Sequence, residues 1–314
     1  MRVTGTVICM FFCCCSFGQV KGTYYDYQWK PCDSLNARFY GTLQKTDSGW
    51  LRHDYYINGI KLQMKALYQD SACKIKNGYA YYFYPNGNLS RFENMIENKR
   101  EGICMGFYSN GYTSDSADYH NGRPKGDLLI WHRNGYPSDS LTHVNDSIDI
   151  AVSWFDNGNP SEAGKLLRGK KIGKWKFFHK NGNPSAIEVY DNDKMISREL
   201  FKEDGSPQSD TTGVNRKVGF KGDITNFKKY LESKLYWPTG YRFETGTKAT
   251  VVVRMNVNEE GDVEDVEMEI PFYPAFDDIA IKTLRHSPKW IPARSHNRNI
   301  KTSIRQPLTF MQDN

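Results

Sequence analysis

The dipeptide Asn-Gly recurs through the first two thirds of this chain at nearly constant spacing. Six copies, followed in register by an Asp-Gly, are separated by 23 to 28 residues. The glycines of the six copies are Gly59, Gly87, Gly111, Gly135, Gly158 and Gly182. Self-similarity at such a period is typical of an array in which one small unit stacks on the next. The recurrence therefore assigns about half of the chain to a repetitive scaffold.

Each repeat unit is predicted to be a β-hairpin. An aromatic-rich run precedes each Asn-Gly, as at residues 175–178, and a more polar run follows, as at residues 185–190. Asn and Gly tolerate positive φ, which predicts a type I′ turn with positive φ at both positions. A second set of turns is expected at residues 99–102, 123–126 and 170–173. The sequence thus predicts a long, twisted meander of antiparallel hairpins.

Three tryptophans precede their turns at similar places, namely Trp131, Trp154 and Trp175. We expect them to stack as a ladder down one face of the sheet. Shared core packing is the favoured interpretation, and a carbohydrate-binding platform is the alternative.

The repeat pattern is most complete at residues 173–183, where it reads Gly-x-Trp-x-Phe-Phe-x-x-Asn-Gly-x. It resembles the MORN repeat in its bacterial variant form. The resemblance covers residues 48–210, which leaves residues 19–47 as an N-terminal lead-in. Members of that family are extended scaffolds, with lipid or protein binding proposed for some. The resemblance therefore implies a binding or spacing role without selecting a ligand.

The N-terminal residues have the pattern of an export signal. One positive charge at Arg2 precedes an apolar stretch over residues 7–17 and a small residue at Gly18. This pattern predicts a secretory signal peptide over residues 1–18. The stretch is shorter than the ~20 apolar residues that span a bilayer. A lipoprotein, acylated at one of the cysteines 13–15, is the alternative. We therefore expect a periplasmic or cell-envelope protein of a Gram-negative bacterium.

Cleavage of the signal would leave three cysteines, Cys32, Cys73 and Cys104. An odd number allows at most one disulfide within the chain, and three partly buried free thiols are the alternative. The formal net charge of +6 is a modest excess for 314 residues. Because a nucleic-acid-binding protein needs a dense basic face, we expect no nucleic-acid partner. Peripheral association of the basic turns with anionic lipid or cell-wall polymer is left open.

A different pattern follows a polar linker at residues 211–217. Asp223 can cap a helix that ends before Trp237-Pro238. Alternating apolar residues at 251–257 and 266–270 predict two strands joined by a hairpin. A second helix is expected at residues 275–285 and a last strand at residues 299–310. The chain as a whole is therefore predicted to be mainly β, ending in a small α+β domain with a three-stranded sheet and two helices.

This order resembles the C-terminal domain of TonB over residues 218–314. The resemblance rests on Gly222-Asp223, Tyr236-Trp237-Pro238, the hairpin at 251–263, residues 276–280, residues 288–292 and the strand at 300–310. In that family the domain binds a short extended peptide, the Ton box of an outer-membrane transporter, as an extra strand on its sheet edge. The resemblance therefore implies recognition of an outer-membrane protein partner by β-augmentation.

The last strand would be the peptide-binding edge. Its residues are Ile300, Lys301, Thr302, Ser303, Ile304, Arg305 and Gln306. We expect the backbone at Lys301, Ser303 and Arg305 to pair with the peptide. In the alternative interpretation, Lys301 and Arg305 are charges that block unwanted pairing at an ordinary edge.

Two further functions stay open as alternatives. An energy-transducing member of the TonB family would need its N-terminal segment to stay uncleaved as a membrane anchor, followed by a proline-rich spacer. Here the thirteen prolines are scattered and the repeats occupy the spacer position. The second alternative is a structural protein that binds the cell wall.

No pattern in the sequence indicates catalysis. None of the seven histidines belongs to a His-x-x-x-His arrangement, and no Cys-x-x-Cys spacing accompanies them. The chain also lacks a Gly-x-Ser-x-Gly nucleophile elbow and a glycine-rich phosphate loop. We therefore predict a protein that is not an enzyme and that uses no metal and no cofactor.

Overall fold

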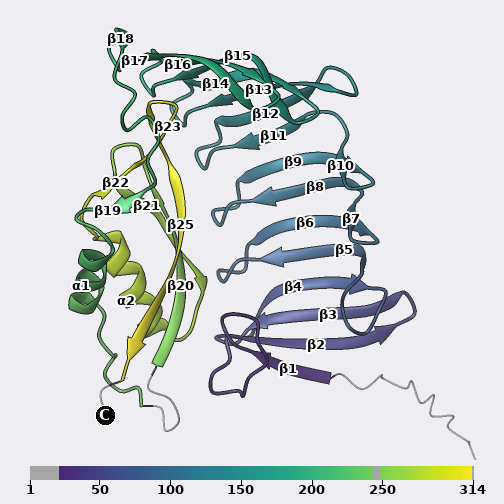
Figure 1. Ribbon diagram of the computed structural model, residues 1–314. Helices are drawn as coiled ribbons and strands as arrows, with labels where there is room; N and C mark the ends of the chain where they lie inside the picture. Colours follow the sequence, from purple (N-terminus) through teal and green to yellow (C-terminus); the bar gives the residue numbers. More distant parts are fainter. Residues whose placement is uncertain (1–20, 243–247, 313–314) are drawn as a thin grey trace, which may run out of the picture.

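The computed structural model describes residues 21–242 and 248–312, so the predicted signal peptide lies outside the described residues. The chain forms a large sheet of 18 strands, followed by a C-terminal region with two helices and a three-stranded small sheet (Figure 1). The predicted fold, a mainly β hairpin meander followed by a small α+β region, is confirmed. Neither described helix has the length and apolar character that a membrane span requires.

The large sheet is an antiparallel meander in which neighbouring strands follow one another along the chain. Its strands are β1 (Lys21–Tyr25), β2 (Phe39–Thr46), β3 (Gly49–Tyr56), β4 (Lys61–Tyr68), β5 (Lys76–Phe83), β6 (Leu89–Ile96), β7 (Lys99–Arg100), β8 (Gly102–Phe107), β9 (Thr113–His120), β10 (Arg123–Pro124), β11 (Leu128–Trp131), β12 (Pro137–His143), β13 (Ile148–Trp154), β14 (Pro160–Leu167), β15 (Lys170–Phe178), β16 (Pro184–Asp191), β17 (Lys194–Phe201) and β18 (Pro207–Gln208). The sheet twists along its length (Figure 1).

The Asn-Gly turns are not of type I′. In the turn at Asn86-Gly87, Gly87 has φ +94°, but Asn86 is not among the residues with positive φ. The amide of Gly87 donates to the carbonyl of Tyr84 (2.8 Å). The side chain of Asn86 accepts from the amide of Asn88 (3.0 Å) and donates to the carbonyl of Ser109 in the next turn (2.9 Å). In the five turns from Asn86 to Asn181, the side-chain amide of the asparagine closes its own turn and binds the following one.

The degenerate seventh pair fits the same explanation. Asp204 accepts from the amide of Ser206 (2.8 Å), as the asparagines do in their turns. An aspartate has no NH₂ group to donate, but β18 ends the large sheet and no further turn follows it. The change from Asn to Asp thus marks the last unit of the sheet.

The type I′ turns lie at the opposite ends of the hairpins. Both central residues have positive φ at Glu97-Asn98, Asn121-Gly122, Arg168-Gly169 and Asn192-Asp193. The prediction therefore placed the second turns, at residues 99–102, 123–126 and 170–173, too far along the chain. Those residues begin the strands β7, β10 and β15 instead.

The expected tryptophan ladder is also wrong. Trp175 is 2% exposed and stacks on Phe177, but no ring contact within the described residues joins it to Trp131 or Trp154. Trp131 and Trp154 lie three residues before their asparagines, whereas Trp175 lies six residues before Asn181. Because that difference is odd, the side chains project from opposite faces of the sheet.

The C-terminal region contains β19 (Gly219–Phe220), α1 (Ile224–Lys234), β20 (Lys248–Val257), β21 (Val263–Ile270), α2 (Pro274–Arg285), β22 (Trp290–Ile291), β23 (Ala293–Ser295), β24 (Arg298–Ile300) and β25 (Thr302–Met311). Asp223 caps α1 as predicted, accepting from the amides of Thr225 and Asn226. The small sheet has the order β21-β20-β25. Both helices cover its face away from the large sheet (Figure 1), around a core that includes Phe276 and Leu284.

The predicted last strand is interrupted at Lys301. Residues before it form β24, which pairs with β23 in a separate short hairpin. Residues after it form β25, which pairs with β20 along its whole length. Cys32, Cys73 and Cys104 are free thiols.

Candidate functional site

β25 forms one edge of the small sheet, and its ladder with β20 is regular over ten residue pairs, from Val257–Thr302 to Lys248–Met311. Pro307 lies within this ladder. A proline fits a sheet where its nitrogen faces away from the neighbouring strand, because it has no N–H to donate. Backbone groups alternate in direction along a strand, so the N–H groups of Ser303, Arg305 and Thr309 point to the open edge with the nitrogen of Pro307.

The other sheet edges of the described chain are short or irregular. The β20–β21 ladder shifts register twice, and Asp265 in β21 has φ 51°. β18 has only two residues. The segment after β1 folds back on it, with the amide of Cys32 donating to the carbonyl of Tyr24 (3.1 Å). Such irregularities protect edges from pairing with other chains, and β25 has none of them apart from Pro307.

Of the seven predicted edge residues, one lies on β24, one lies between β24 and β25, and the five residues 302–306 lie on β25. Ile300 belongs to β24, where it pairs with Ala293, and is not on the edge strand. Ile304 packs against the helix-covered core. Ser303 and Arg305 are exposed, and their side chains lie on the other face, which is turned toward the large sheet. The expected outward pairing of Ser303 and Arg305 is thus compatible with the ladder.

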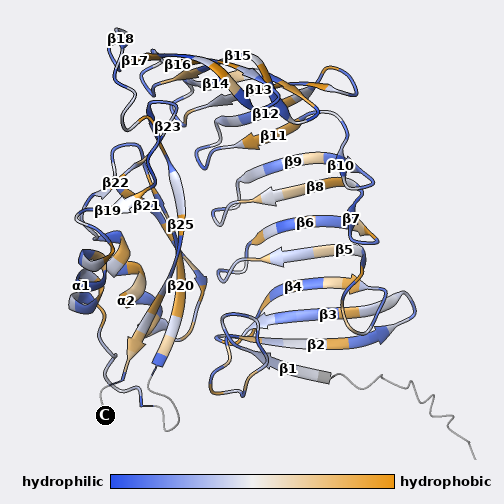
Figure 2. Ribbon diagram, in the orientation of Figure 1, coloured by the Kyte–Doolittle hydropathy of each residue, from blue (hydrophilic) through white to orange (hydrophobic). Residues whose placement is uncertain are grey.

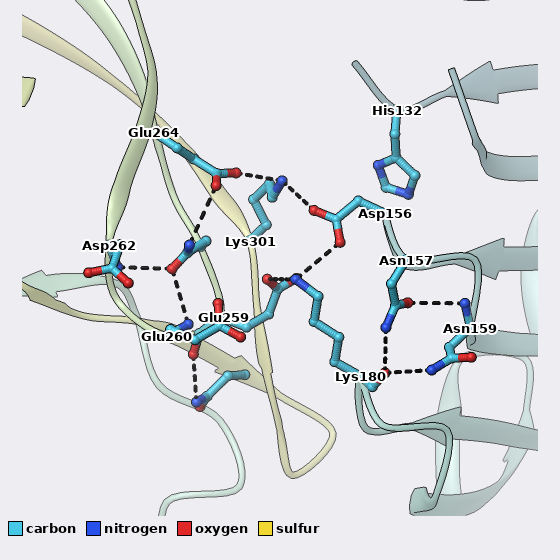
Figure 3. A network of polar contacts seen from close by, with 12 residues as sticks. His132, Asp156, Asn157, Asn159, Lys180, Glu259, Glu260, Asp262, Glu264 and Lys301 are labelled. Atoms are coloured by element: carbon cyan, nitrogen blue, oxygen red, sulfur yellow. Dashed lines mark hydrogen bonds and ion pairs between the residues drawn. The ribbon is translucent and has the colours of Figure 1, made fainter. Parts of the chain in front are cut away.

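Lys301 is engaged by the large sheet. Its ammonium group forms ion pairs with Asp156 (2.9 Å), in an Asn-Gly turn, and with Glu264. Asp156 also pairs with Lys180 of the next turn (3.0 Å), which reaches Glu259 (2.9 Å) (Figure 3). Burial acts to raise the pKa of Asp156, but the hydrogen bonds from the two lysines outweigh it and lower that pKa to about 2. The Lys301 side chain therefore links the small sheet to a turn of the large sheet.

The six repeat glycines all have positive φ, between 79° and 94°. Their turns line the side of the large sheet that faces the C-terminal region (Figure 1). In four of the six turns the residue before Asn-Gly makes the contact. Arg133 pairs with Asp265 (3.5 Å) and with Glu267, Ser109 donates to Glu267, and Asp156 and Lys180 make the ion pairs given above. The repeat turns are thus a docking surface for the small sheet.

A ladder of side-chain hydrogen bonds runs beneath these turns. In five of the six units, the residue two positions before the Asn donates to the carbonyl three positions before the next Asn (or Asp204). These bonds run from Tyr56 to Phe83 (3.0 Å), Tyr84 to Phe107 (2.8 Å), Tyr108 to Trp131 (2.6 Å), His132 to Trp154 (2.9 Å) and His179 to Phe201 (3.1 Å). Each bond ties one unit to the next.

The ladder is interrupted at Phe155, which has no donor for the carbonyl of Phe178. Arg298 of β24 occupies this position. Its guanidinium donates to the carbonyl of Phe178 (3.4 Å), lies 5.7 Å from the Phe155 ring centroid, and pairs with Glu162 (2.8 Å). The C-terminal region thus supplies the donor that the repeat lacks.

The β23–β24 turn contacts the last units of the large sheet. His296 stacks on Phe177 (3.6 Å between centroids) and donates to Glu188 (2.9 Å), which is fully buried. Burial acts to raise the pKa of Glu188, but hydrogen bonds, including that from His296, lower it to about 2. Asn297 donates to the carbonyl of Phe201 (2.8 Å). This hairpin fixes one end of the C-terminal region.

The opposite end is held by residues next to β2. The guanidinium of Arg38 lies 3.6 Å from the ring centroid of Phe272 and donates to the carbonyl of Thr250 (3.1 Å). Phe39 and Val252 belong to a shared buried cluster. Burial lowers the pKa of Arg38 to about 10.

A cleft of about 780 Å³ lies between these contacts. The large sheet contributes four tyrosines together with charged side chains, and the small sheet contributes polar and charged side chains. The residues are Tyr56, Tyr82, Tyr84, Tyr108, Arg91, Glu93 and Arg133 on the large sheet, and Arg254, Glu267, Glu269 and Ser303 on the small sheet. Because Ser303 lines it, the cleft adjoins the open edge of β25. A polypeptide at that edge could extend side chains into the space.

Sequence reasoning missed the docking residues. One usable signal was the position before Asn-Gly, which carries Ser109, Arg133, Asp156 and Lys180 in successive units while Asn-Gly itself is constant. Another was Phe155, which breaks a run of tyrosines and histidines. Within the residues that the structure describes, no group of three or more His, Cys, Asp or Glu side chains is placed to hold a metal ion.

No protein-family model matches this chain, and a search of curated proteins also returns no match.

Proposed function

We propose that this chain is a non-enzymatic binding protein of the cell envelope that takes up an extended peptide of a protein partner as a fourth strand beside β25. The observation that carries the proposal is the edge itself: ten residues in regular register, with exposed side chains at Ser303, Arg305, Pro307 and Thr309. Main-chain hydrogen bonds to such an edge supply affinity, and the alternating side chains supply selectivity.

The large sheet acts as the scaffold in this proposal. Its turns hold Glu267 of β21 and Lys301 just before β25, and its last units hold the β23–β24 hairpin. These contacts leave the outward side of β25 uncovered by any strand of the described chain. The scaffold therefore fixes the small sheet while presenting its edge.

The partner class follows from the resemblance to TonB noted in the sequence. An N-terminal segment of an outer-membrane receptor is the proposed peptide, and the export pattern of residues 1–18 would place the chain in the same compartment.

The test is titration of the full chain with N-terminal peptides of outer-membrane receptors. Ser303→Pro removes one outward N–H, and we expect it to abolish binding while the fold survives. Ser303→Ala keeps that N–H and is the matched control, which should bind as the wild type does. Unchanged binding by a folded Ser303→Pro variant would move the site to another surface.

Two further measurements separate the alternatives. Mass spectrometry of the mature N-terminus should find a chain beginning at Gln19, whereas an intact Met1 would favour an anchored energy transducer. Retention on purified cell wall, without peptide binding, would favour the structural role.

A further inference from the structure

The face of the small sheet turned toward the large sheet carries charges on all three strands. Where it docks, carboxylates outnumber cations. Arg133 faces Asp265 and Glu267, while Lys180 and Lys301 together face Asp156, Glu259 and Glu264. Each of these three cations is therefore fully compensated.

Arg254 and Arg305 form the opposite arrangement. They are direct partners in the β20–β25 register, and both bind the same carboxylate, Glu269 of β21. The distances are 2.7 Å from Arg254 Nη2 and 2.6 Å from Arg305 Nε. Like charges directly opposite one another are unfavourable in a sheet. Glu267, the register partner of Arg254 on β21, pairs with Arg133, so Arg254 and Arg305 share Glu269.

The two arginines that share Glu269 lie beside the open edge. The side chain of Arg305 is 47% exposed and that of Arg254 is 54% exposed. Among the described residues, neither forms an ion pair other than that with Glu269. Across the sheet the order is thus carboxylate, guanidinium, guanidinium and then the vacant side of β25.

We propose that the peptide strand added to β25 carries an Asp or Glu opposite Arg305, on the side that faces the large sheet. This inference rests on the proposed function and adds the chemistry of the ligand. The backbone of Arg305 points outward, so the facing residue of the new strand has its side chain on the same face as the Arg305 guanidinium. A carboxylate there can form a charge-assisted, bidentate pair with it.

The neighbouring positions limit the recognised segment. Pro307 offers no N–H to a new strand, so continuous pairing is confined to the part of β25 before it. Two positions from the acid, on the Ser303 side, the added strand passes the mouth of the 780 Å³ cleft. The expected ligand is therefore a short extended segment with an acidic residue and, two positions away, a side chain that can enter a partly aromatic cleft.

The experiment is selection of random ten-residue peptides, displayed on phage, against the full chain. We expect enrichment of Asp or Glu at one fixed position. Replacing that residue in a selected peptide by its amide should weaken binding about tenfold, the effect of ~1.4 kcal/mol that a hydrogen bond to a charged group can supply. Against Arg305→Gln, the acid and amide forms should bind equally.

Arg285→Gln is the matched control, because Arg285 is an exposed arginine at the end of α2, on the helix-covered side. It should retain the full preference for the acid. The Arg305→Gln fold is checked by its thermal unfolding, and Glu269 keeps its partner Arg254 in that variant.

The outcomes separate a failure of the acidic-residue inference from a failure of the proposed edge-strand function. If no peptide is enriched, or if enriched peptides still bind Ser303→Pro, the edge-strand function fails. If peptides are enriched and lost on Ser303→Pro but show no acidic preference, the function stands and the acid inference is wrong. An acidic preference that persists in Arg305→Gln would equally overturn it.

Discussion

The C-terminal region and the large sheet stabilise their strands by different means. The C-terminal region gathers fourteen buried side chains into one cluster between its helices and the small sheet. The much longer large sheet has separate clusters of five and four, and hydrophobic and hydrophilic stretches are mixed along its strands (Figure 2). Its units are joined instead by repeated hydrogen bonds from turn asparagines and from the tyrosine and histidine ladder.

The difference shows how each part responds to change. In a stacked array each unit contacts mainly its neighbours, so a local defect has local consequences. In a single core every side chain contacts many others, so one deletion affects the whole. The docked C-terminal region also bridges distant units of the array, at Arg38 near β2 and at His296 near β16.

The largest effect is expected from Phe276→Ala. Phe276 is fully buried and packs edge-on against Trp237 and Phe310. Its loss should destabilise the C-terminal region by about 3–5 kcal/mol, measured by denaturant unfolding. Tyr112→Ala, at a residue 61% exposed in the large sheet, is the control and should change stability by less than about 0.5 kcal/mol. Equal midpoints for the two variants would contradict the comparison.

The next effect concerns the contact between the regions. Arg298→Met leaves the carbonyl of Phe178 without its donor and should cost about 1–3 kcal/mol. Phe155→Tyr in the same chain would restore a ladder hydroxyl and should recover part of this loss. The two changes therefore form a double-mutant cycle with favourable coupling. If the changes in unfolding free energy caused by the two substitutions were strictly additive, Arg298 would not be replacing the hydrogen bond that Phe155 cannot make.

Gly135→Val should have an effect of similar size that is confined to its own unit of the large sheet. Gly135 has φ 86° and open space around its Cα, so the cost is backbone strain of about 1–3 kcal/mol. Gly219→Val, where φ is not positive and the space is also open, is the matched control and should be tolerated. A wild-type denaturant midpoint for Gly135→Val would refute the turn assignment.

The regions should also differ in their response to pH. The pKa values of Asp156 and Glu188 are both lowered to about 2, so their stabilising contribution is complete above pH ~4.5 and is lost as the pH falls toward 2. Burial raises the pKa of Asp277 in α2 to about 6, so its contribution has the opposite sign and decreases as the pH rises from about 4 to 6. Hydrogen exchange of the β23–β24 hairpin should increase in acid before that of α2. The reverse order would contradict the assigned ion pairs.

Much of the fold could be predicted because its signals are local. The spacing of Asn-Gly sets the hairpin period, and Asp223 caps a helix through contacts within three residues. The predicted type I′ turn at Asn-Gly was wrong. The prediction relied on the tolerance of Asn for positive φ, whereas the Asn side-chain amide forms a hydrogen bond with the next turn, which lies outside the local sequence. The tryptophan ladder failed because similar distance from a turn does not fix the face of the sheet.

The candidate site could be predicted only in part. The edge strand follows from the order of elements, and Ser303 and Arg305 lie on it. The engagement of Lys301 by Asp156 joins residues 145 positions apart, and nothing local to either residue encodes it. The ion pairs of Glu269 were equally hidden from local patterns, because the two arginines that share this carboxylate come from two other strands.

Residue-resolved amide exchange along β25 tests the central claim most directly. In the free chain, the outward N–H groups of Ser303, Arg305 and Thr309 should exchange rapidly, while those of Ile304 and Leu308, paired with β20, should be protected. A selected peptide should then slow exchange at Ser303 and Arg305. Protection of Ser303 and Arg305 in the free chain, or no change there when a peptide binds, would contradict an open edge that accepts a strand.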